Sequence, residues 1–167
     1  MFRRLRETGP AALVPLAWGF ATAAHAELLQ LRTVRIGLLV MDALLVAFTV
    51  LSWRDMREGV LFAWKLVLVV GTAANLLATV AVFADPVDLA LAAAAIVAWM
   101  LVPAVAYVYT GLRVERAPSV YFAGAVLSGL GTVAYLSSVG APTLAYVGFA
   151  LVGVGQTAGI VTAVRTY

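Results

Sequence analysis

Six apolar stretches of 18 to 23 residues follow one another along the chain and leave only short connections between them. A bilayer core about 30 Å thick is crossed by a helix of roughly 20 apolar residues, so each stretch predicts one membrane-spanning helix. Neighbouring helices joined by such short links are expected to pack antiparallel. The sequence therefore predicts an all-α, polytopic membrane helix bundle, a single transmembrane domain over 1–167, with helices at 10–31, 36–53, 61–83, 89–111, 119–138 and 142–164.

The composition supports this class and excludes others. Only 11% of the residues are charged, against about a quarter in soluble domains, and 64% are hydrophobic. The chain has no cysteine and one histidine, which excludes disulfides, thiolate metal sites and bis-histidine haem ligation within it. The arginines occur in small groups between apolar stretches, which is typical of membrane flanks rather than of nucleic-acid binding. We expect the lipid bilayer as a partner, and no metal, cofactor or nucleic acid.

The arginines also predict the orientation. With the N-terminus inside, eight arginines lie at cytoplasmic ends of the predicted helices and two, Arg32 and Arg35, lie outside. This imbalance predicts a protein of the cell membrane with both termini in the cytoplasm. A cleaved signal peptide is the alternative for the first stretch, because Ala24-His25-Ala26 resembles a cleavage site. We expect the segment to be retained, and the later helices keep the same orientation either way.

A shift of 81 positions aligns part of the chain with itself. Trp18 then falls on Trp99, and Arg32 falls on Arg113. Three predicted helices separate the copies, so the two halves would have opposite topology, as in many transporter folds. A chance match between alanine-rich segments is the alternative to this 3+3 inverted repeat.

Four polar side chains are expected in the outer half of the first three helices. Asp42 lies seven residues into the second predicted helix, about 10 Å deep by the helix rise, and His25 and Asn75 lie at matching depths. Glu27 lies half a turn further out than His25. Ionisable groups at membrane depth are costly and often functional, and a histidine beside a carboxylate can exchange protons near neutral pH.

This group predicts a proton- or cation-handling site. Two alternatives stay open at this point. In the first, the four side chains form a hydrogen-bond network that only fixes helix packing. In the second, Glu27 simply faces the outer headgroups.

The last predicted helix holds a second group of candidates. Gly155 and Gly159 are one turn apart, with Gln156 between them. Small residues at this spacing allow another backbone to approach closely, which predicts a packing face within the chain or between copies in a homo-oligomer. A ligand-binding Gln156 is the alternative. Pro103 lies inside the fourth helix, where neighbouring groups must satisfy the carbonyl that a proline leaves without a donor.

Three functions are compatible with these patterns. A small permease or channel-like protein, moving a small solute, ion or proton, is favoured by Asp42 at depth and by prolines inside two helices. A non-catalytic accessory subunit of a larger membrane complex is favoured by the short loops and small-residue faces. The third is an intramembrane enzyme acting on lipid. We expect no enzyme, because the chain carries no serine-nucleophile, zinc-peptidase or nucleotide-binding motif.

Overall fold

The computed structural model describes residues 2–166, and their side chains from residue 11 onward. All the regular structure in this part of the chain is helical, which confirms the predicted all-α bundle. Six α-helices and one short 3-10 turn follow one another: α1 (Phe2–His25), α2 (Leu31–Ser52), α3 (Gly59–Phe83), α4 (Leu89–Gly111), α5 (Pro118–Leu136), η1 (Ser137–Val139) and α6 (Thr143–Thr166).

Five of these helices, α2 to α6, are long and apolar enough to cross a membrane. The bounds of α3 and α4 agree with the predicted 61–83 and 89–111 to within two residues. Among the residues searched, α1 contributes a shorter apolar segment, Ala11–His25. The chain is therefore a multi-pass membrane protein.

The link between α1 and α2 lies earlier in the chain than predicted. Helix α1 ends at His25 and α2 begins at Leu31, rather than at 31 and 36. Glu27 has a left-handed backbone with φ of 57°, a conformation that L-residues rarely adopt inside a helix. Arg35 therefore lies inside α2, where its Nε donates a hydrogen bond to the Val82 carbonyl of α3 at 3.1 Å. The prediction placed this arginine in a loop because the second apolar stretch begins at Ile36.

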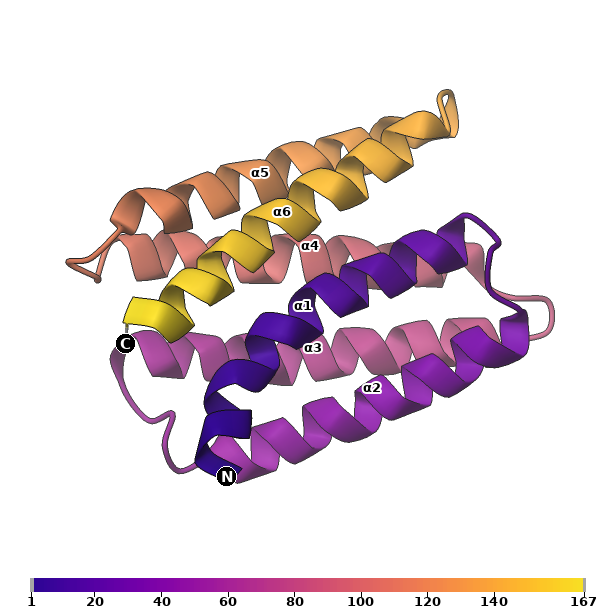
Figure 1. The fold of residues 1–167 in the computed structure, drawn as a ribbon. Coiled ribbons are helices and arrows are strands. Elements are labelled where there is room, and N and C mark those ends of the chain that lie inside the picture. Colours follow the sequence, from indigo (N-terminus) through magenta and orange to yellow (C-terminus); the bar gives the residue numbers. More distant parts are fainter. Residues whose placement is uncertain (1, 167) are drawn as a thin grey trace.

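The helices alternate in direction through the bundle. Figure 1 shows both chain ends at one side, here called the termini end, and the α1–α2, α3–α4 and α5–α6 links at the opposite, far end. Successive contacts run α2, α3, α4, α5, α6 and then α1, so that α1 lies against α6. Helices α1 and α2 touch where Phe20 meets Gly37, but they do not pack along their length. The expected antiparallel pairing of neighbours is therefore wrong for α1 and α2.

This arrangement bears on the inverted repeat. A 3+3 repeat equates the pair α1–α2 with the pair α4–α5. Helices α4 and α5 pack closely, whereas α1 packs against α6 instead of α2. The packing of these two pairs therefore differs and gives the repeat no support.

Glycines bring α5 and α6 into close contact. A β-carbon added to Gly124 would lie 2.9 Å from the Gly155 carbonyl oxygen, and one added to Gly131 would lie 2.7 Å from that of Gly148. Gly159 faces the ring of Tyr107 on α4. The predicted face of Gly155 and Gly159 is thus a packing face within the chain, and it provides no basis for a homo-oligomer formed through these residues.

Candidate functional site

Asp42 lies at the middle of α2, eleven residues after its first residue. The helix rise places it about 16 Å from that end, deeper than the sequence predicts, because α2 begins five residues earlier than expected. The side chain is buried, with 8% of its surface exposed. Asp42 is therefore a carboxyl group near the centre of the membrane-spanning part of the bundle.

Two side chains of α3 bind this carboxyl group. The Asn75 amide donates a hydrogen bond from Nδ2 to Asp42 Oδ1 at 2.8 Å. The Thr79 hydroxyl donates to Asp42 Oδ2 at 2.7 Å. Each carboxyl oxygen thus has one donor, and both donors are neutral.

Asn75 is held in a defined orientation. Its Nδ2 also points to the backbone carbonyl of Leu38 on α2, at 3.4 Å, and 7% of the residue is exposed. If the amide were turned over, its oxygen would face two acceptors, Asp42 Oδ1 and the Leu38 carbonyl. The amide therefore presents its N–H groups to Asp42, as the assignment of amides from their hydrogen-bond partners requires.

The sequence predicts Asp42 and Asn75 as neighbours, whereas Thr79 is not among the predicted site residues. The signal was present, because residues four apart lie on one face of a helix, and Thr79 follows Asn75 by four. A threonine is a weak signal at such a position, because threonines inside membrane helices commonly donate to their own backbone.

A shallow, open apolar depression lies beside this site, on the face of α2. Its described lining comprises Asp42, Ala43, Val46, Ala47, Val50 and Leu51.

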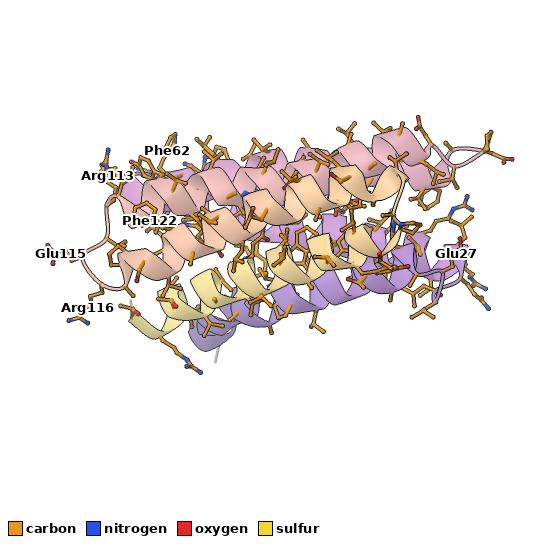
Figure 2. All side chains as sticks on the ribbon, turned by 90° about the horizontal axis from the view of Figure 1, so that it is seen from above. Glu27, Phe62, Arg113, Glu115, Arg116 and Phe122 are labelled. Atoms are coloured by element: carbon orange, nitrogen blue, oxygen red, sulfur yellow. The ribbon has the colours of Figure 1, made fainter. Side chains whose placement is uncertain are left out.

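His25 and Glu27 do not join Asp42. His25 is the last residue of α1, so the helix rise separates it from the level of Asp42 by more than 10 Å. Glu27 is exposed in the link to α2, and Figure 2 shows it at the far end, opposite the labelled residues of the α4–α5 link. The predicted group of four is thus reduced to Asp42 and Asn75, with Thr79 added.

The His25 ring instead packs against aromatic rings of α5 and α6. Its centroid lies 6.0 Å from that of Tyr135, 5.8 Å from that of Tyr146 and 5.4 Å from that of Phe149. The last two rings meet it nearly edge to face, the arrangement that aromatic pairs favour. His25 therefore fixes the far end of α1 to the α5–α6 pair.

Gln156 joins three helices at a second buried position. Its Oε1 accepts a hydrogen bond from Trp18 Nε1 of α1 at 2.9 Å, and its Nε2 donates to the Trp99 carbonyl of α4 at 3.1 Å. Pro103, four residues after Trp99, has no N–H to donate to that carbonyl. Gln156 therefore supplies the missing donor, which confirms that a neighbouring group satisfies the carbonyl freed by Pro103.

The Gln156 backbone is used as well, because its carbonyl accepts a hydrogen bond from the Tyr107 hydroxyl at 2.6 Å. Only 4% of Gln156 is exposed. Its side-chain oxygen and nitrogen both serve contacts between helices, and an amide has no ionisable group, so Gln156 is assigned to helix packing and Asp42 is favoured as the candidate site.

Among the residues that the structure describes, no three His, Asp or Glu side chains lie together as a metal-binding group. No family model matches the chain, and no curated protein and no solved structure matches it. The fold and the site therefore define its class: a multi-pass integral membrane protein with a buried, hydrogen-bonded carboxyl group between α2 and α3.

Proposed function

We propose that the protein is a small permease or channel-like protein that moves a small cation, with Asp42 as the group that binds it. The observation that carries the proposal is the carboxyl group of Asp42, buried at the middle of α2 with two neutral donors. Ionisable residues inside membranes typically mark ion pathways and proton relays.

The chemistry of the Asp42 carboxyl group favours this function over simple helix packing. An aspartate at the centre of a membrane helix costs about 2.5–3.5 kcal/mol on insertion scales. A neutral residue of the same shape, such as asparagine, would bridge α2 and α3 with less penalty. A carboxyl group at this position is therefore best explained by a need for its exchangeable charge.

Ion flux tests the proposal. Purified protein in liposomes is expected to pass protons or monovalent metal cations down an imposed gradient, and Asp42→Asn is expected to lose nearly all of this flux because an amide has no ionisable proton. Asp88→Asn is the matched control. Asp88 caps α4 by accepting a hydrogen bond from the Leu91 N–H at 2.9 Å, and asparagine caps equally well, so its flux should match the wild type.

An inactive wild type that is folded and correctly inserted would contradict the proposal. It would leave the accessory-subunit interpretation. Equal flux in wild type and Asp42→Asn would contradict the role of Asp42.

Thermal stability distinguishes the role of the charge of Asp42 from that of its shape and hydrogen bonds. Asp42→Asn is expected to keep its melting temperature in detergent, because an amide can still bond to Asn75 and Thr79. Asp42→Leu removes the acceptor of both side-chain hydrogen bonds from α3 and should lower the free energy of unfolding by about 1–3 kcal/mol. Thermal unfolding of the two variants side by side measures this difference, and equal losses would contradict the hydrogen-bonded geometry.

The proposed orientation places both termini in the cytoplasm of the cell, as the arginine distribution predicts. Reporter domains fused after Met56 and after Pro118 are expected on the cytoplasmic side, and fusions after Val87 and Gly140 outside. A reversed signal at any of these four positions would overturn the orientation.

A further inference from the structure

We infer that the cation bound at Asp42 is a proton rather than a metal ion, and that the Thr79 hydroxyl allows the site to hold either protonation state. This inference rests on the proposed function and specifies the ion that the site handles. It also assigns a positioning role to Thr79.

The donor geometry argues against a metal ion. A hard cation needs several oxygen atoms with their lone pairs directed at it. Around Asp42, the Asn75 amide directs its N–H groups inward, held there by the Leu38 carbonyl. The Thr79 hydroxyl also directs its hydrogen to the carboxyl group. Hydrogen-bond donors directed at a carboxyl group occupy the oxygen lone pairs that a metal ion would need.

The protonated form needs a different arrangement, and a hydroxyl can supply it because it both donates and accepts. A proton arriving from hydronium forms an O–H bond at Asp42 Oδ2 and leaves a water molecule. The new O–H donates to Thr79 Oγ1. The Thr79 hydrogen then turns to the backbone carbonyl of Asn75, four residues back. Release to water at the other side reverses these steps.

The second position of the Thr79 hydroxyl is an ordinary one for this helix. Thr72, also on α3, donates to the carbonyl of Leu68, four residues back, at 2.7 Å. Thr110 and Thr132 make the same type of bond to Ala106 and Ser128. Thr79 differs from these three threonines because its hydroxyl donates to a carboxyl group, and the inference requires it to reach the Asn75 carbonyl when that group is protonated.

Thr79→Val and Thr79→Ser test the role of the hydroxyl, with Thr72→Val as the matched control on the same helix. Proton flux is measured in liposomes with an internal pH-sensitive dye, first without sodium and lithium and then with each. We expect the wild-type protein to pass protons when both metal ions are absent. We also expect that a sodium or lithium gradient does not drive transport. Thr79→Ser and Thr72→Val should behave as the wild type.

The pH dependence of proton flux tests the role of Thr79, because a purely structural role of its hydroxyl would leave the pH of half-maximal flux unchanged. Thr79→Val removes a donor from the ionised carboxyl group, which favours the protonated form. The pH of half-maximal flux should therefore rise by about one to two units, the equivalent of one hydrogen bond to a charged group. Thermal unfolding in detergent shows that the variant is folded.

The outcomes distinguish the two levels of the proposal. Flux that requires sodium or lithium overturns the proton inference while the proposed function stands. Absence of any cation flux overturns the proposed function itself. Proton flux with an unchanged pH profile in folded Thr79→Val overturns the role of Thr79.

Discussion

Gln156→Leu is expected to destabilise the bundle by about 3 kcal/mol. Leucine fills a similar volume but leaves Trp18 Nε1 without an acceptor and the Trp99 carbonyl without a side-chain donor. Buried polar groups left unpaired cost about 1–3 kcal/mol each. Chemical unfolding in mild detergent measures the loss. Thr162→Val on the same helix is the control, because the Thr162 hydroxyl bonds only to its own helix, at the Ala158 carbonyl.

A second substitution makes the cause specific. Pro103→Ala restores a backbone N–H that can donate to the Trp99 carbonyl, as in an uninterrupted helix. Gln156→Leu should therefore cost less when Pro103→Ala is also present, and the difference between the two costs measures the coupling. Strictly additive effects would show that the amide of Gln156 does not serve the carbonyl that Pro103 leaves free.

Gly131→Leu is expected to lower the stability by about 2–3 kcal/mol, in the upper part of the range for overpacked cores. Its β-carbon alone would lie 2.5 Å from Val152 Cγ2 and 2.7 Å from the Gly148 carbonyl oxygen. The oxygen belongs to the backbone of α6, so α5 and α6 must separate to make room.

Gly129→Leu, two residues earlier on α5, is the matched control because no atom lies within 4 Å of its added β-carbon. Melting temperatures of the two variants in detergent provide the comparison. Equal losses in both would contradict the observed contact of α5 with α6, because leucine has a higher helix propensity than glycine at both positions and only packing distinguishes them.

Sequence patterns predict the helices better than they predict which helices meet. The bounds of α4 agree with the predicted 89–111, because Asp88 precedes the helix and Gly111 with a polar link ends it. The link at Glu27 was misplaced because apolar content does not reveal a left-handed residue. The path of α1 could not be predicted from the sequence either, since it depends on the contact of Trp18 with Gln156, 138 residues away.

The same limit explains which part of the site was predicted. Asp42 and Asn75 lie on consecutive helices joined by a short link, so comparing their depths was enough to place them together. The same comparison of depths predicted His25 beside Asp42, but the position of His25 depends on which helix α1 packs against. Its aromatic partners Tyr146 and Phe149 come from α6, at the other end of the sequence, and no local pattern indicates them.

The central claim is that the carboxyl group of Asp42 gains and loses a proton inside the membrane. Infrared difference spectroscopy of the protein in lipid, between acidic and alkaline buffer, tests it most directly. The account predicts a protonated-carboxyl band that is present in acid, is replaced by a carboxylate band in alkali, and is absent from Asp42→Asn. A carboxyl group of Asp42 that keeps one protonation state across the pH range in which the protein stays folded would contradict the account.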